Sequence, residues 1–266
     1  MLERGSRGAP AGATNLRVVK IGGRAQEDPA LVSRLVAAWN DAPGSLCIVH
    51  GGAAEIDRLQ RALGGKPRFV GGRRVTSAED IDTVRMALSG AANKRLVAAL
   101  NAAGVPAVGV SGEDAAMLRA TPFDAALGRV GRPETVRADL LRLLLAAGFL
   151  PVVAPLAAPP AGETGALNVN GDDAAAAIAL ALGARELFFV TDVEGVRRGA
   201  EKLSKLDAAE AATLLASGAA EGGMAVKVAS ALGALAGGTA RVRIGGCDAL
   251  ADPALGTTLT LHGEET

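Results

Sequence analysis

The sequence contains few aromatic residues and no long apolar runs. Aromatic residues make up 2% of its 266 residues, and tyrosine is absent. The interior must therefore be built from Ala, Val, Leu and Ile, because hydrophobic residues still account for 49% of the chain. No stretch approaches the roughly 20 apolar residues that a membrane-spanning helix needs. We therefore expect no association with a membrane.

Neither sign of charge dominates, and cysteine is scarce. The 28 basic residues balance 28 acidic ones, so no global field attracts nucleic acid or an anionic membrane. This balance favours a small-molecule enzyme or binding protein. Cys47 and Cys247 lie in or beside apolar runs, far apart in the sequence. We interpret them as buried thiols of a cytoplasmic protein, with a disulfide as the alternative.

The order of apolar patterns predicts an α/β fold. Residues 1–15 contain Arg, Gly and Pro without a hydrophobic signal core, which predicts a disordered N-terminal tail. Short β-branched runs follow at 16–22, 45–50, 106–111, 150–155, 186–191 and 240–245. Helical patterns occupy 29–40, 53–63, 79–103, 134–147, 172–182, 207–216 and 224–236. Strands that are apolar on both faces and alternate with helices indicate a mainly parallel central sheet in a three-layer αβα sandwich.

Two segments interrupt this alternation. The sequence FVGGRRVT (69–76) predicts a β-ribbon flap that turns at Gly71-Gly72. The sequence APPAGETGA (158–166) is typical of a loop or linker, and it predicts a boundary between two lobes near residue 166.

Paired glycines follow the first two predicted strands, and they point to an anionic ligand. Gly22-Gly23 and Gly51-Gly52 come where strand ends meet helix N-termini. Glycine there lets backbone N–H groups approach a phosphate, although a tight strand-to-helix turn would need the same residues. The Walker A pattern is absent, and no two glycines are separated by a single residue. Both a P-loop NTPase and a dinucleotide dehydrogenase therefore lose their usual support.

Lysines and polar residues in apolar surroundings are the other candidates. Lys20 ends the first strand in VVKIGGR (18–24), and Lys227 interrupts the apolar helical pattern of EGGMAVKVASAL (221–232). A lysine in such a pattern is also compatible with a solvated surface position. In NVNGDDAAAA (168–177), four Asn and Asp residues precede an Ala-rich helix. One of them suffices as an N-cap, so the surplus suggests contact with a ligand.

These segments together resemble the amino acid kinase family, and within it the acetylglutamate kinase branch. The matching segments are KIGG, VHGG, GRRVTSAEDID, ALSGAANKRLV, AVGVSGED, LPVVAP, NVNGDDAAAAIA, TDVEGV and GGMAVKV. They cover almost the whole chain in the family's order. The resemblance implies an eight-stranded, mainly parallel sheet between helices, with an acyl amino acid bound by residues 16–166 and MgATP by residues 167–266. It also implies dimerisation through the first of these lobes.

The resemblance assigns roles to matched positions. Lys20 and Lys227 would be the catalytic lysines, with Asp172 organising them. Gly23 and Gly52 would donate N–H groups to the transferring phosphoryl group, Arg74 would grip the substrate α-carboxylate, and Asn168 would hold the substrate beside it. Positions expected at the phosphates or nucleotide are Gly22, Gly23, Gly51, Thr191, Asp192, Gly195, Gly223 and Met224. No metal ligand is expected on the protein, since ATP carries the Mg²⁺.

The implied reaction is transfer of the ATP γ-phosphoryl group to the γ-carboxylate of N-acetyl-L-glutamate, a step of arginine biosynthesis. A carboxylate with a pKa near ~4.3 is already ionised at neutral pH, so no general base is needed. Ala53, which stands in the substrate-binding region, replaces a third glycine of the family pattern. This departure keeps open a sister kinase that acts on another N-blocked or carrier-protein-bound amino acid.

A sensor without catalysis is the third reading, and Lys20, Asp172 and Lys227 together speak against it. The Gly- and Pro-containing N-terminus does not resemble the helix of arginine-inhibited members. We therefore expect a homodimer without arginine feedback.

Overall fold

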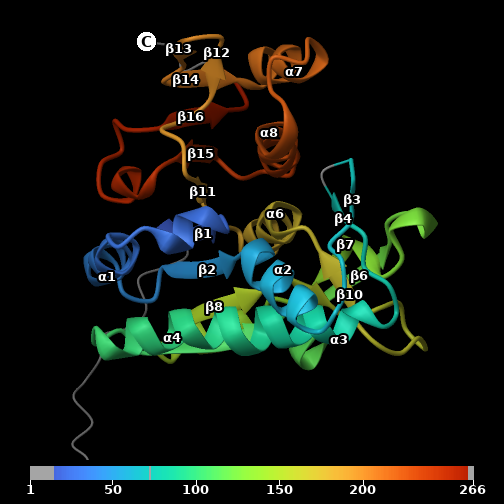
Figure 1. Ribbon diagram of the computed structural model, residues 1–266. Coiled ribbons are helices and arrows are strands. Elements are labelled where there is room, and N and C mark those ends of the chain that lie inside the picture. The colour runs from blue at the N-terminus through green and yellow to red at the C-terminus, as the bar shows by residue number, and fades with distance from the viewer. Residues whose placement is uncertain (1–14, 72, 263–266) are drawn as a thin grey trace, which may run out of the picture.

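A single eight-stranded sheet forms the centre of the computed structural model, which describes residues 15–71 and 73–262. Its strand order is β14-β16-β15-β11-β1-β2-β8-β5 (Figure 1). The six predicted strands are confirmed as β1 (Arg17–Ile21), β2 (Leu46–His50), β5 (Ala107–Ser111), β8 (Leu150–Ala154), β11 (Glu186–Val190) and β15 (Arg241–Gly245). The sheet is completed by β14 (Lys205–Asp207) and β16 (Thr257–Thr260), and only the β15–β16 pair is antiparallel.

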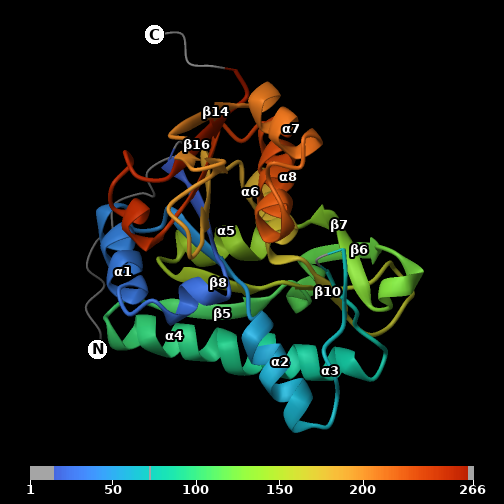
Figure 2. The ribbon, with the colours of Figure 1, turned by 45° about the horizontal axis from the view of Figure 1, so that its top comes forward.

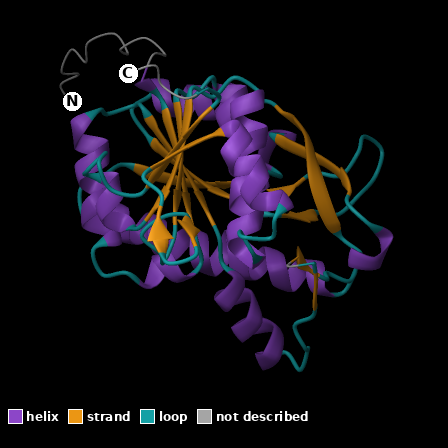
Figure 3. Cartoon of the chain, turned by 90° about the horizontal axis from the view of Figure 1, so that it is seen from above, coloured by secondary structure: helices purple, strands orange, loops and turns teal. Residues whose placement is uncertain are grey.

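Helices cover both faces of this sheet (Figure 3). On one face lie α1 (Leu31–Asp41), α4 (Asn93–Ala102) and a 3₁₀ turn at Cys247–Leu250. The other face carries α5 (Asp139–Ala146), α6 (Gly171–Leu182), α7 (Ala208–Ala216) and α8 (Gly222–Ala236). Successive strand residues enter opposite cores: Val18 packs toward α6, whereas Val19 packs toward α1. The predicted three-layer αβα sandwich is therefore confirmed.

A second, four-stranded sheet was not predicted from the sequence. It contains β6 (Leu118–Pro122), β7 (Val130–Val136), β10 (Leu167–Val169) and β9 (Leu156–Ala157), in that order. It packs against the first turns of α6 (Figure 2). The predicted helix over 134–147 is wrong at its start, because residues 134–136 belong to β7, which pairs with β6, and the helix α5 begins at Asp139. The loop at 158–166 joins β9 to β10, which pair with each other.

The remaining predicted elements agree with the structure. The helical pattern at 79–103 becomes α3 (Asp80–Arg85), a π-helical segment (Met86–Ala92) and α4. The flap is present as β3 (Phe69–Val70) paired with β4 (Arg73–Arg74), while Gly72 of its turn lies outside the described residues. Helix α2 (Ala53–Ala62) follows β2, a 3₁₀ turn (Arg24–Glu27) follows β1, and β12 (Arg197–Arg198) pairs with β13 (Glu201–Lys202). Short 3₁₀ turns also occur at Asp114–Ala116 and Ala125–Leu127.

The predicted N-terminal tail falls almost entirely outside the described residues, which begin at Asn15. The Asn15 side chain accepts a hydrogen bond from Arg185 at 3.1 Å. Within 15–71 and 73–262, no helix has both the length and the apolar character needed to cross a membrane.

Gly112 lies at the junction of the two sheets, and its substitution tests their packing. A Cβ at this position would lie 2.1 Å from the Leu156 carbonyl oxygen and 2.7 Å from the Leu118 Cβ. Backbone atoms cannot move away cheaply, so we expect Gly112→Ala to lower the free energy of unfolding by about 3 kcal/mol. Gly233→Ala is the control, because a Cβ there meets nothing within 4 Å on α8 and should raise stability by about 0.5–1 kcal/mol. Urea denaturation measures both, and equal stability of Gly112→Ala and the wild type would contradict this packing.

Candidate active site

The two predicted glycine turns lie side by side, because β1 and β2 are neighbouring parallel strands. The Gly22 N–H donates to the Val190 carbonyl and the Gly51 N–H to the Ile21 carbonyl, each at 2.9 Å. These two N–H groups therefore extend the sheet and are not available to a ligand. Gln26 links the turns, since its Nε2 donates to the Gly51 carbonyl oxygen at 2.7 Å.

Gly52 is the N-cap residue of α2 and lies directly beside the π-helical segment. A Cβ on Gly52 would lie 2.6 Å from the Leu88 Cδ2, so a side chain here would displace Leu88. The glycine thus allows close approach of α2 to the segment Met86–Ala92. π-Helical segments often occur at functional sites, and Leu88 also lines a cavity described below.

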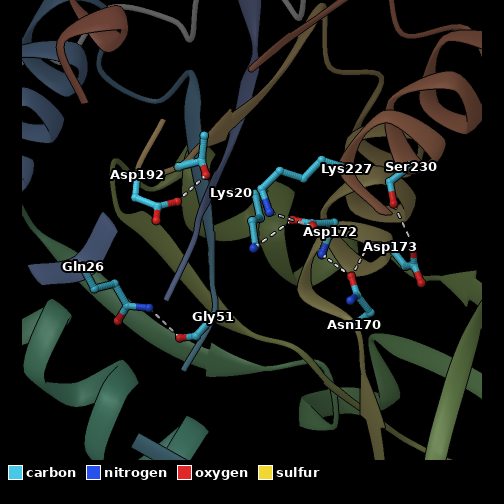
Figure 4. A network of polar contacts seen from close by, with 10 residues as sticks. Lys20, Gln26, Gly51, Asn170, Asp172, Asp173, Asp192, Lys227 and Ser230 are labelled. Atoms are coloured by element: carbon cyan, nitrogen blue, oxygen red, sulfur yellow. Dashed lines mark hydrogen bonds and ion pairs between the residues drawn. The ribbon is translucent and has the colours of Figure 1, made fainter. Parts of the chain in front are cut away.

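Three charged residues from distant parts of the chain meet at the end of β1 (Figure 4). The Lys20 Nζ lies 2.8 Å from the Asp172 Oδ1, and the Lys227 Nζ lies 3.2 Å from the Asp172 Oδ2. Strand alternation points Lys20 to the same face as Val18, which is the face covered by α6 and α8. Asn170 caps α6 by accepting the Asp172 N–H at 2.8 Å and the Asp173 N–H at 3.3 Å.

The charges of this cluster determine each other's ionisation. Burial lowers the pKa of Lys20, and Lys227 lowers it further, whereas Asp172 opposes both effects. Burial would raise the pKa of Asp172, but Lys20 and Lys227 outweigh it, so that the pKa lies below its usual value. Asp172 is therefore ionised at neutral pH. One carboxylate between two lysines leaves a positively charged site that can attract anions.

Two cavities meet at this cluster. The first has a volume of about 190 Å³ and the second about 370 Å³. Lys20 and Gly23 line both. Among the predicted residues, the first cavity also contacts Gly51, Gly52, Ala53, Arg74 and Asn168. The second is lined by Gly22, Thr191, Asp192, Gly223, Met224 and Lys227. Nearly all predicted positions are thus brought together around one junction.

Gly195 is the predicted position that the structure brings neither to a cavity nor to the Lys20–Asp172–Lys227 cluster. Gly195 has a φ of +156°, and a Cβ there would lie 2.6 Å from the Thr257 Oγ1. The fold itself therefore requires a glycine at this position. Gly195 therefore allows the loop after β11 to pass close to β16.

The neighbouring arginines of the flap both line the first cavity, but their surroundings differ. Arg74 pairs with Asp57, donates to the Gln60 Oε1 at 3.2 Å, and lies 4.7 Å from the centre of the Phe69 ring. Arg73 pairs with Asp173 at 2.9 Å. Sequence reasoning selected only Arg74.

Residues that sequence reasoning missed complete the two cavities. Arg73 and Phe69 of the flap line the first, Arg24 lines the second, and Gln26 joins the glycine turns. In the second cavity Arg24 pairs with Asp192 at 2.8 Å. Arg24 directly follows Gly22-Gly23, and this position could have identified it as a candidate site residue. Arg73 could not be identified in this way, because arginine is common throughout the sequence.

His50 ends β2 and is fully buried behind the glycine turn. Its Nδ1 lies 2.8 Å from the Gly51 carbonyl oxygen, and its Nε2 lies 3.1 Å from the Asn93 Nδ2. Nδ1–H therefore donates while Nε2 accepts. Burial lowers the pKa of His50 to about 4, although the hydrogen bond to Gly51 opposes this shift. The imidazole is neutral at pH 7, and both ring nitrogens are engaged within the protein.

A doubly wound sheet with two lysines at the junction of two cavities is an arrangement that can bring two anionic ligands together. Residues 15–246 match the amino acid kinase family. An acetylglutamate kinase of Roseiflexus sp. (strain RS-1) is 43% identical over 253 residues, which are 93% of this chain and 94% of that protein. An acetylglutamate kinase of Rubrobacter xylanophilus is 42% identical over 258 residues, covering 92% and 97%.

A solved structure, smu.665 from Streptococcus mutans UA159, has a TM-score of 0.81 and 29% sequence identity to this chain. The match covers 93% of this chain and 99% of that one. The chain belongs to the amino acid kinase family, which confirms the resemblance found in the sequence motifs.

The buried imidazole of His50 predicts a loss of stability in acid. Its pKa of about 4 in the folded protein lies below the ordinary value of 6.5, so the unfolded chain takes up the proton first. Stability is therefore lost as the pH falls from 6.5 toward 4, by about 2 kcal/mol at pH 5. His50→Gln should remove this part of the pH dependence, while His262→Gln, which alters an exposed histidine, should retain it. Urea unfolding at pH 7.5 and pH 5 measures the difference, and identical pH dependences in wild type and His50→Gln would contradict it.

Proposed function

We propose that the protein transfers the γ-phosphoryl group of ATP to the γ-carboxylate of N-acetyl-L-glutamate, giving N-acetyl-L-glutamyl 5-phosphate and ADP in arginine biosynthesis. The observation that carries this proposal is the Lys20–Asp172–Lys227 cluster at the junction of two cavities. The similar proteins named acetylglutamate kinase support the choice of substrate.

The first cavity suits an N-acylated amino acid with two carboxylates. Arg73 and Arg74 supply positive charge at one side, and Lys20 supplies it at the other. Leu88 and Val130 provide apolar surface for an acyl group. We propose that Arg74 binds the α-carboxylate, because a planar guanidinium can contact both of its oxygens. Asn168, whose Nδ2 donates to the Thr76 Oγ1 at 3.1 Å, presents its amide beside the substrate.

The second cavity suits a nucleotide. The N-terminus of α8 contributes Gly223 and Met224, and backbone N–H groups at a helix N-terminus favour phosphate. Lys227 lies one turn further along the helix, and Gly22 also lines this cavity. We place the nucleotide beside Thr191 and Asp192. We propose that Mg²⁺ enters with the ATP phosphates, because both Asp172 oxygens already contact lysines.

The reaction follows from this placement. The ionised γ-carboxylate forms a bond to the γ-phosphorus, the bond from that phosphorus to the β–γ bridging oxygen breaks, and ADP leaves with the electron pair. No proton is transferred, which agrees with the engaged nitrogens of His50. Lys20, which lines both cavities, neutralises charge on the transferring group, and Lys227 neutralises the leaving ADP. Gly23 and Gly52 direct their N–H groups at the phosphoryl oxygens.

The proposal extends to the organisation of the protein. Residues 16–166 would hold the acyl amino acid and residues 167–266 would hold MgATP, with 168–171 contributing to the first cavity as well. The homodimer and the cytoplasmic location belong to the proposal too. The buried free thiols of Cys47 and Cys247 agree with a reducing compartment.

Ala53 favours one alternative substrate class. Its methyl group lines the acyl cavity where the family pattern has a third glycine, so another N-blocked or carrier-protein-bound amino acid is the second candidate. Trapping the acyl phosphate with hydroxylamine tests the two. We expect product with N-acetyl-L-glutamate, and strong product only with N-succinylglutamate or N-acetylaminoadipate would contradict the proposed substrate.

Lys20→Ala should lower kcat by at least about 10²-fold, because a preorganised cation at the developing charge is lost. Lys202→Ala provides the control, since Lys202 is exposed on β13 and lines neither cavity. A coupled assay of ADP formation measures kcat for both variants. Turnover of Lys20→Ala within a factor of three of the wild type would exclude the proposed role.

Arg74→Ala should raise the KM for N-acetyl-L-glutamate by about 10- to 100-fold with a smaller effect on kcat, since the α-carboxylate does not react. Asp57 also loses its buried partner in this variant. Arg61→Ala is the matched control, because Arg61 is an exposed partner of the same carboxylate at 3.8 Å. Steady-state kinetics with varied N-acetyl-L-glutamate measure both variants. An unchanged KM in Arg74→Ala would refute the assignment.

A further inference from the structure

Arg73 lines the first cavity, and one of its guanidinium nitrogens has no hydrogen-bond partner among the described residues. Its Nη2 lies 2.9 Å from the Asp173 Oδ2, and its guanidinium carbon lies 4.2 Å from the centre of the Phe123 ring. Its Nη1 is buried without a hydrogen-bond partner among the described residues. Because Arg73 lines the first cavity, its guanidinium group is available to a ligand carboxylate bound there.

The other carboxylate oxygen of Asp173 contacts helix α8, which also lines the second cavity. The Ser230 Oγ donates to the Asp173 Oδ1 at 2.8 Å (Figure 4). Ser230 is buried on α8, three residues after Lys227, and therefore lies on the same side of the helix. The same helix contributes Gly223 and Met224 to the wall of the second cavity.

We propose that Arg73, Asp173 and Ser230 form a bridge that couples the two ligand sites, with Arg73 binding a substrate carboxylate and the other two acting as positioning residues. The proposal rests on the proposed function, because it takes the ligands to be the acyl amino acid and the nucleotide. It joins the flap, the N-terminus of α6 and helix α8 through two charge-assisted hydrogen bonds.

The physical basis is the rigidity of the guanidinium group. A carboxylate bound to the Arg73 guanidinium group fixes the plane of that group and thereby holds Nη2 against Asp173. Asp173 is then held between Arg73 and Ser230, which favours the position of α8 that places Lys227 against Asp172. The acyl substrate therefore raises the affinity for the nucleotide, and the nucleotide raises the affinity for the acyl substrate by the same factor.

Calorimetric titration of the full-length protein tests the bridge. The Kd of a non-hydrolysable ATP analogue with Mg²⁺ is measured with and without saturating N-acetyl-L-glutamate, and the titration is repeated in the reverse order. For the wild type we expect the Kd to fall by about 5- to 150-fold in each direction. In Ser230→Ala the factor should approach one, while the Kd for each ligand alone stays within about twofold. Arg73→Gln should lose the coupling and also bind N-acetyl-L-glutamate more weakly.

Two control variants match these changes. Arg132→Gln alters an exposed arginine that lies 4.8 Å from the same Phe123 ring but does not line the cavity. Ser33→Ala removes an exposed hydroxyl on α1 that donates to the Ala30 carbonyl oxygen. Both should retain the full coupling factor. A merely structural Ser230 would lower the melting temperature without changing this factor, so thermal unfolding is measured alongside.

The outcomes separate this proposal from the proposed function. Absence of coupling in a wild type that turns over N-acetyl-L-glutamate overturns the bridge alone, as does full coupling in Ser230→Ala. Absence of turnover with N-acetyl-L-glutamate overturns the proposed substrate. The coupling factor is then measured with the dicarboxylate that the hydroxylamine assay identifies, and a Ser230→Ala factor equal to that of the wild type again refutes the bridge.

Discussion

The carboxylate of Asp172 is the interaction on which the site depends. Two buried ammonium groups without an anion between them would each incur a desolvation penalty and would repel one another. Asp172 lies within 3.2 Å of both Lys20 and Lys227 and so makes their convergence possible. It also ties β1, α6 and α8 together. Its own position is fixed by Asn170, which caps α6. The local chemistry of one helix N-terminus thus organises residues that are far apart in the sequence.

The strand order explains why two cavities adjoin at this point. β1 lies between β11 and β2, so the loop after β1 is shared by both halves of the sheet. The turn after β2 contributes Gly51 and Gly52 to the first cavity, and the residues after β11 contribute Thr191 and Asp192 to the second. In an open parallel sheet, ligands bind beyond the carboxyl ends of the strands. Two ligands bound on either side of β1 therefore meet at Lys20 and Gly23.

The sequence predicted the features whose cause is local. The six predicted strands are short, mainly apolar runs, and Lys20 and Lys227 are rare charges in apolar surroundings. Within the small sheet, β9 and β10 were missed because they have only two and three residues and are defined by their pairing. Gly195 shows a second limit. At Gly195, a side chain would clash with Thr257. At a phosphate-binding turn, a side chain would block the ligand. The sequence shows only a glycine in both cases and does not distinguish the two reasons.

The two arginines of the flap illustrate what only tertiary structure reveals. Asp57 already occupies Arg74, so a substrate carboxylate that replaces Asp57 exchanges one charge-assisted hydrogen bond for another. Arg73 instead keeps its Asp173 contact and also lines the first cavity. A carboxylate bound at Arg73 would therefore add a charge-assisted contact without breaking the Asp173 pair. The structure thus adds Arg73 to the residues that line the proposed carboxylate-binding cavity, although sequence motifs single out only Arg74.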